Sequence, residues 1–332
     1  CCDLTQYGIE HELLAQCFMP NIGGIIAVSY VESQFEFNLI SPSVLDYSVI
    51  DGTEPAESML TVNEYIAEDY WSAVNGSSLP ENLQGVRSRA DEISEKYGVR
   101  ILLSSQCLPA CTFAEYPTTT TDQMDLADEA ASINAALDSL EEALSLYPEG
   151  FFPQFHSEFG DGGIRIMLVG GFESNFNMIG YSVQNSLWHN IYVDIFSEGL
   201  VGTYCHEIWH ATEDHITSIN YGEFDVVQWA ELNPDGFQYI FDPAESILNE
   251  GDYTYFGSTK PKDCYFIDGY AKTNEREDRA RIMEYAMTGF FGSELSEYPH
   301  LYAKLRYMSD KIRQYFDTTG WSTPRWEDAL GE

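Results

Sequence analysis

Hydrophobic residues recur along the chain with two different spacings, and these spacings predict its helices and strands. Recurrence at every third or fourth position is typical of a helix that buries one face, whereas alternating or short continuous apolar runs are typical of strands. The predicted helices cover 60–76, 83–97, 126–146, 200–216 and 296–316. The predicted strands cover 24–31, 99–103, 164–170 and 187–195.

This order of elements predicts an α+β fold, with a small mixed β-sheet packed on helices and a mainly helical C-terminal lobe. Residues 79–332 are expected to form one domain, with its core at about 160–292. Residues 1–78 form an N-terminal region in which we find no candidate chemistry. The stretch 223–272 is rich in aromatic, Gly and Pro residues, and connections of this length are commonly lids or binding loops.

The motif His206-Glu207-Ile208-Trp209-His210 places two histidines four residues apart on a predicted helix. Such positions lie on the same face of a helix, so that both imidazoles can reach one metal ion. Glu207 leaves the helix at another angle, and it can act as a general base toward a metal-activated water. The preceding strand at 187–195 and turn are the context that this motif needs. We therefore predict one catalytic Zn²⁺ ion bound by His206 and His210.

A catalytic zinc ion of this kind needs a third protein ligand. The metzincin pattern requires His and Gly where this chain has Ile216 and Glu213, so that class is rejected. Glu231 lies near the distance at which thermolysin-like enzymes place a glutamate, but its neighbours, including Pro234, predict a loop rather than a helix. Glu277 is the better candidate.

Glu277 stands in the first turns of a further predicted helix, which either Thr273 or Asn274 can cap. Tyr270 precedes it by seven residues. Two plainer interpretations stay open. Glu277 could be a surface charge that pairs with Arg281 one turn later, and Tyr270 could be an ordinary half-buried aromatic residue.

Together these motifs resemble the lethal-factor-like gluzincin metallopeptidases, in which H-E-x-x-H is followed by Tyr-x6-Glu at the start of a helix. The chain is also similar to the zinc-binding metallopeptidase lipoproteins of gut bacteria. Their W-x-x-L-N-P-x-G-F-x-Y loop and T-N-x-x-E-D helix correspond to 229–239 and 273–278 here, and the resemblance covers roughly 91–318. It implies a zincin-like fold and these site residues: zinc ligands His206, His210 and Glu277, general base Glu207, and oxyanion donor Tyr270.

One position departs from the family pattern. Many members follow the ligand glutamate with Asp-Phe-Ala-Glu, whereas this chain has Asp278-Arg279-Ala280-Arg281, so an acidic group is missing four residues on. Ligating histidines usually donate their other ring N–H to a carboxylate or a carbonyl group. Asp278 and Asp214 are the nearest candidates for this support.

The predicted function is zinc-dependent endopeptidase activity toward a peptide or protein substrate. The strand at 187–195 could hold an extended substrate by main-chain pairing, and His189 on this strand is a candidate substrate contact. The competing function is a non-catalytic surface lipoprotein that binds glycans or proteins with the same fold. The intact motif argues against it, because a binding module has no need of Glu207.

The charge of the chain narrows the class of partner. Its 54 acidic and 16 basic residues give a net charge of −38, so nucleic acid, which requires a basic surface, is not expected to bind. The acidity could attract basic peptides, although solubility is the more ordinary explanation. No apolar run reaches the length of a membrane helix. We expect a monomer.

The seven cysteines bear on location and cross-linking. Bacterial lipoproteins are cleaved directly before the cysteine that carries the lipid. A chain that begins at Cys1 is therefore expected at the cell surface or outside the cell, with Cys1 as lipid anchor, although a leading cysteine also arises by chance. Cys107 and Cys111 could close a short loop or be buried thiols. Cys205 is expected to pack in the core, with a bridge to Cys264 as the alternative.

Overall fold

The structure is a computed structural model that describes most of the chain from residue 79 onward and three strands before it. The described residues are 17–19, 24–31, 34–40 and 79–331, without 108–115, 157–161, 174–177, 186–187, 220–221, 223, 244–254, 257–261 and 293. β1 (Cys17–Met19), β2 (Gly24–Val31) and β3 (Gln34–Ile40) form an antiparallel sheet. The strand predicted at 24–31 is confirmed, whereas the helix predicted at 60–76 lies outside the described residues.

The main sheet has four strands in the order β4-β6-β9-β8: β4 (Arg100–Leu103), β6 (Gly163–Val169), β9 (Trp188–Asp194) and β8 (Gly180–Asn185). β4, β6 and β9 run parallel to one another, and β8 pairs with β9 in the antiparallel sense. Every residue of β6 is buried, as expected for a continuous apolar run inside a parallel sheet. The small mixed sheet predicted from the sequence is therefore confirmed. β5 (Thr118–Thr119) and β7 (Gly171–Phe172) form a separate short pair.

The position of β9 inside this sheet corrects one prediction. β9 pairs with β6 on one side and with β8 on the other, so its main-chain groups are occupied and cannot hold a substrate. Among the strands that the structure describes, β8 stands at the edge instead. β8 was not predicted, because its sequence has few of the β-branched and apolar residues that mark the other strands.

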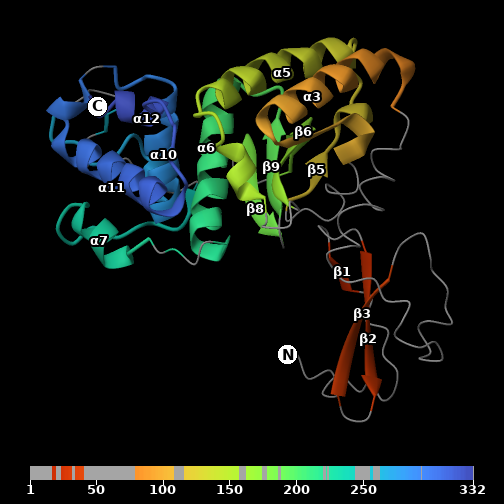
Figure 1. Cartoon of the computed structure of the whole chain (residues 1–332), viewed down its shortest axis with the longest axis horizontal. Coiled ribbons are helices and arrows are strands. Elements are labelled where there is room, and N and C mark those ends of the chain that lie inside the picture. The colour runs from red at the N-terminus through yellow and green to blue at the C-terminus, as the bar shows by residue number, and fades with distance from the viewer. Residues whose placement is uncertain are drawn as a thin grey trace.

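Helices cover the sheet and continue into a second lobe (Figure 1). The α-helices are α3 (Gln84–Tyr97), α5 (Glu129–Ser145), α6 (Leu200–Asp214), α7 (Val226–Glu231), α10 (Glu275–Met287), α11 (Pro299–Tyr315) and α12 (Arg325–Asp328). Shorter turns are η4 (Glu81–Leu83), η5 (Ser104–Cys107), η6 (Thr121–Gln123), η7 (Phe152–Phe155), the π-helical η8 (His215–Ile219), η9 (Tyr270–Lys272) and η10 (Leu295–Glu297). The helices predicted at 83–97, 126–146, 200–216 and 296–316 are confirmed, while α7 and α12 were not predicted.

α6 stands between the sheet and the helical C-terminal lobe (Figure 1). It packs on β8, β9 and α5 from one side and on α10 from the other. As a result, all residues from Gly202 to Glu213 are buried. A single hydrophobic core connects α3, α5, the sheet, α6 and the C-terminal helices. An α+β arrangement with its candidate site between sheet and helical lobe is thus observed.

Cys107, Cys205 and Cys264 are buried. Cys205 and Cys264 are free thiols, so the bridge considered between them is absent and Cys205 packs in the core. The buried Cys107 Sγ atom lies 3.7 Å from the carbonyl oxygen of Leu168. Cys111 and Cys1 lie outside the described residues. In the part of the chain that the structure describes, none of the helices has the length and apolar character needed to cross a membrane.

Candidate metal centre

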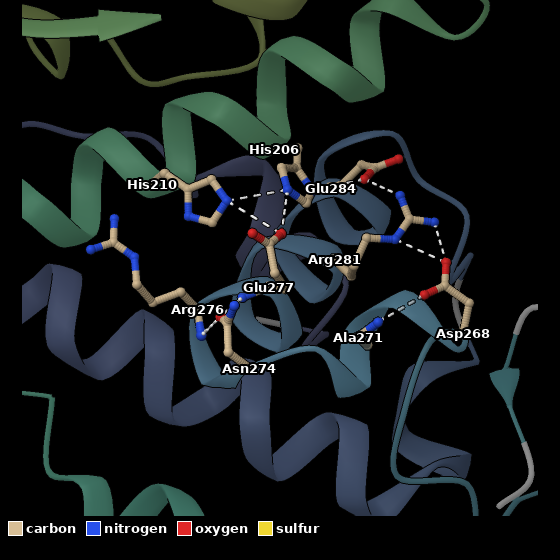
Figure 2. A network of polar contacts seen from close by, with 9 residues as sticks. All are labelled: His206, His210, Asp268, Ala271, Asn274, Arg276, Glu277, Arg281 and Glu284. Carbon is tan, nitrogen blue, oxygen red and sulfur yellow. Dashed lines mark hydrogen bonds and ion pairs between the residues drawn. The ribbon is translucent and has the colours of Figure 1, made fainter. Parts of the chain in front are cut away.

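Two helices bring the predicted ligands together. His206 and His210 are buried and lie one turn apart on α6. On the facing helix, the Asn274 side chain accepts hydrogen bonds from the backbone N–H groups of Arg276 and Glu277 at 2.9 and 3.0 Å. Asn274, rather than Thr273, is therefore the N-cap of α10. This cap places Glu277 in the first turn, with its carboxylate directed at both imidazoles (Figure 2).

The three candidate ligand atoms lie at the separations that a zinc ion requires. His206 Nε2 is 3.0 Å from Glu277 Oε2 and 3.2 Å from His210 Nε2, and His210 Nε2 is 3.5 Å from Glu277 Oε2. Ligand atoms about 2.0–2.1 Å from a tetrahedral zinc ion lie about 3.3 Å from one another. Two nitrogens and one oxygen are the donor set of a His₂Glu catalytic site. The residues therefore fit the expected ion, and no other such group was found among the described residues.

The carboxylate that supports His206 is Glu284, not either of the two predicted aspartates. Glu284 Oε2 lies 3.3 Å from His206 Nδ1, and Glu284 follows Glu277 by seven residues on the same face of α10. Asp278 is buried on the other side of that helix, where it contacts Lys304 Nζ at 2.6 Å. Asp214 pairs with Arg276 at 2.7 Å. The two-turn spacing from Glu277 was the available signal for Glu284.

The structure also decides whether Glu277 pairs with Arg281 and whether Glu231 lies near the candidate ligands. Glu277 does not pair with Arg281, because Arg281 contacts Asp268 and Glu284 instead. Glu231 is the last residue of α7, so the prediction of a loop there was wrong. Its side chain is exposed and is not part of the group formed by the candidate ligands.

The side chain of Glu207 lies against the start of β8. A Cβ atom on Gly180 would come within 2.9 Å of Glu207 Oε1, so the glycine allows the strand to approach this closely. Within the described part of the chain, the buried Oε2 atom of Glu207 has no hydrogen-bond partner. Burial raises the pKa of Glu207 to about 7, although His206 and His210 oppose the rise. A carboxyl group with this pKa can accept and release protons near neutrality.

Tyr270 lies on η9, next to the candidate ligands. Its ring centroid is 6.2 Å from that of His206, and its hydroxyl group interacts with Glu277. Burial, followed by the negative charges of Glu277 and Glu207, raises the pKa of Tyr270 above its ordinary value. The phenol therefore stays neutral at physiological pH and can donate a hydrogen bond. Tyr270 is half-buried beside the site. This position agrees with a role as oxyanion donor and equally with that of an ordinary half-buried aromatic residue.

The electrostatics of the site favour a cation. Burial alone would lower the pKa of His206, but hydrogen bonds to Glu277 and Glu284 raise it to about 10. Burial would raise the pKa of Glu277, yet His210 and then His206 hold it well below its ordinary value. Three carboxylates (Glu207, Glu277 and Glu284) thus converge on the two histidines, and this excess of negative charge would stabilise a bound metal ion.

The candidate ligands lie in a cleft of about 1030 Å³. One wall is the run from Ile179 to Gln184, which includes most of β8, and the opposite side is formed by η9 and the start of α10. Phe241 and Pro243 also line it.

His189 does not line this cleft, so its prediction as a substrate contact was wrong. Its side chain is fully buried, 5.5 Å from the Phe155 ring and 5.7 Å from the His215 ring.

Comparison with known proteins gives no match to a family model, to a curated protein or to a solved structure. The family resemblance therefore remains a prediction that rests on the motifs, and the zincin-like fold remains part of it.

Proposed function

We propose that the protein is a zinc-dependent endopeptidase related to the gluzincin metallopeptidases that its motifs resemble. The observation that carries this proposal is the convergence of His206, His210 and Glu277 at separations of 3.0–3.5 Å, with Glu207 beside them. When bound there, Zn²⁺ would supply Lewis acidity toward a carbonyl group and make water ionisable near neutral pH.

The remaining chemistry belongs to two side chains. Glu207 takes the proton of the attacking water on its free Oε2 atom and later passes it to the leaving amine. Its raised pKa of about 7 suits both transfers. Tyr270 donates a hydrogen bond from its hydroxyl group to the oxygen on which negative charge develops. This stabilisation is strongest in the transition state.

The edge strand β8 supports a peptide as substrate. Among the described residues, β8 is hydrogen-bonded to β9 on one side and has no strand on the other, and it forms a wall of the cleft. An extended peptide could therefore add to the sheet by main-chain hydrogen bonds beside Glu207. This mode recognises the main chain rather than a chain end, which favours an endopeptidase.

The test uses the purified full chain, a mixed peptide library and mass spectrometry of the products. We expect cleavage that a zinc chelator abolishes and added zinc restores. Glu207→Gln should keep one zinc ion per chain, measured by elemental analysis, and lose roughly 10²–10⁴-fold in rate. Glu198→Gln makes the same change at an exposed position before α6 and should keep full activity.

Two outcomes would count against the proposal. Cleavage that the chelator does not affect would exclude a metal-dependent mechanism. A zinc-loaded protein that cleaves no peptide would instead favour the non-catalytic binding function.

A further inference from the structure

A chain of charged contacts joins the turn that carries Tyr270 to the imidazole of His206 (Figure 2). Its members are Asp268, Arg281 and Glu284, which we call the charged bridge. At one end, Glu284 Oε2 lies 3.3 Å from His206 Nδ1 and also accepts a hydrogen bond from Arg281 Nη1. At the other end, Arg281 donates from Nε and Nη2 to Asp268 Oδ2 at 3.0 and 2.5 Å.

The two carboxylate oxygens of Asp268 accept hydrogen bonds from two different elements. Oδ2 binds Arg281 on α10, whereas Oδ1 accepts a hydrogen bond from the backbone N–H of Ala271 at 3.1 Å. Ala271 lies in η9 directly after Tyr270, so this bond holds the turn on which the phenol stands. Asp268 therefore fixes η9 and α10 relative to each other at the edge of the cleft.

Arg281 is suited to a fixed geometry because its guanidinium group is planar and forms several directed hydrogen bonds at once. Its side chain is only 19% exposed, and that of Glu284 is 15% exposed, so solvent screens these contacts incompletely. Arg281 also brings positive charge next to Glu284, which stands among the other carboxylates of the site. Loss of Arg281 would leave Glu284 without the partner that sets its orientation toward His206.

We propose that Asp268 and Arg281 are positioning residues. Through the charged bridge they hold Tyr270 in a fixed position relative to His206, the proposed ligand. The proposal rests on the proposed peptidase function for the role of Tyr270, but the orientation of His206 and of η9 can be measured without turnover. An error of about 1 Å in the placement of a catalytic group can cost about 10²-fold in rate, so such fixing has a measurable effect.

The first experiment is a double-mutant cycle on kcat and KM with a cleaved peptide. Asp268→Ala should lower kcat by roughly 10- to 100-fold and leave KM nearly unchanged, because Tyr270 acts in the transition state. In the Tyr270→Phe background the same change should have little further effect. Asp268→Asn keeps an oxygen for the Ala271 N–H and should retain more kcat than Asp268→Ala.

The second experiment needs no substrate. Zinc affinity is measured by competition with a chromogenic chelator, and order in the turn by hydrogen–deuterium exchange over 269–273. Arg281→Met should weaken zinc binding roughly 10- to 100-fold, as is usual when support of a ligating histidine is lost. It should weaken zinc binding no further in a Glu284→Gln background. Both Arg281→Met and Asp268→Ala should speed exchange of the turn.

Arg313→Met is the matched control. Arg313 forms the same kind of two-pronged contact with Glu327, but in the C-terminal lobe and outside the cleft. This variant should leave kcat, zinc affinity and exchange over 269–273 unchanged.

The charged bridge is refuted if the losses from Asp268→Ala and Tyr270→Phe simply add. It is equally refuted if Arg281→Met binds zinc as the unaltered chain does and exchanges the turn at the same rate. If no peptide is cleaved at all, the proposed function fails. The zinc-affinity and hydrogen-exchange measurements would still show whether the charged bridge positions His206 and η9.

Discussion

Gly180 and Glu207 are so close that a Cβ atom at position 180 would lie 2.9 Å from Glu207 Oε1 and 3.2 Å from its Cγ atom. The first residue of β8 therefore limits where the proposed base can stand. Gly180→Ala should displace the Glu207 carboxylate and lower kcat at least about tenfold. Steady-state kinetics on the zinc-loaded variant provide the measurement.

Gly85→Ala is the control for this change. Position 85 lies inside α3, and a Cβ atom there meets nothing within 4 Å. Replacement of a helical glycine by alanine should raise stability by about 0.5–1 kcal/mol and leave kcat unchanged. Full activity of Gly180→Ala would show that Glu207 tolerates displacement, contrary to its assigned role.

Zinc removal should loosen the contact between α6 and α10, because the three candidate ligands come from both helices. At free zinc about 1000-fold above Kd, binding would stabilise the folded state by about 4 kcal/mol. We expect a chelator to lower Tm in the unaltered chain and to have no effect on His210→Ala, which lacks a ligand. Scanning calorimetry with parallel elemental analysis tests this, and an unchanged Tm after chelation would argue against the metal centre.

The buried pair of Asp278 and Lys304 should make the C-terminal lobe sensitive to the loss of either partner alone. Both side chains are fully buried, Lys304 Nζ contacts Asp278 Oδ2 at 2.6 Å, and the Tyr239 hydroxyl donates to the same oxygen at 3.0 Å. Lys304→Met leaves the carboxylate buried without its cation and should cost about 3–5 kcal/mol in urea unfolding.

Two further variants test this explanation. Asp278→Asn combined with Lys304→Met removes both charges and should recover a large part of the loss. Lys262→Met breaks an exposed pair with Glu297 and should change stability little. An equal cost for the single and the double variant would show that the effect is not due to an unpaired charge.

Two buried histidines should make the protein sensitive to acid. Burial lowers the pKa of His189 to about 3 and that of His215 to about 4, from an ordinary value of 6.5. Between about pH 6.5 and pH 4 the unfolded chain therefore binds protons that the folded chain does not. The free energy of unfolding should fall as pH falls through this window, by up to about 1.4 kcal/mol per pH unit for each histidine.

His189→Phe removes one of these titrating groups, and aromatic rings already surround the position. Urea unfolding at several values between pH 7 and pH 4.5 should give a shallower loss of stability for this variant. Identical slopes for the variant and the unaltered chain would mean that His189 does not remain neutral in the folded state.

The sequence predicted that His206, His210 and Glu277 lie together, because the information for this grouping is local. Two histidines at helical spacing define one face of α6, and the acidic first turn after Asn274 defines the facing helix. Glu284 was within reach of the same reasoning, since a residue two turns after Glu277 returns to the same face. Glu284 was not predicted, because the family pattern places the acidic group four residues after the ligand glutamate, where this chain has Arg281.

The order of the strands in the sheet could not be predicted from such local patterns. The apolar run of β9 predicted a strand, but nothing in that run tells whether its edges are paired. β8 became the edge strand through contacts between distant segments, and its short polar sequence gave little local signal. The partnership of Asp278 and Lys304, 26 residues apart on different helices, likewise depends on tertiary packing.

The separation of 71 residues between His206 and Glu277 has a consequence for biosynthesis. A growing chain that has not yet passed α10 presents both imidazoles but lacks the carboxylate, so it holds a cation only weakly. With the proposed metal site, metal acquisition would wait until translation has supplied α10 and this helix has docked on α6. Under the proposed function, products that terminate before Glu277 would therefore stay inert.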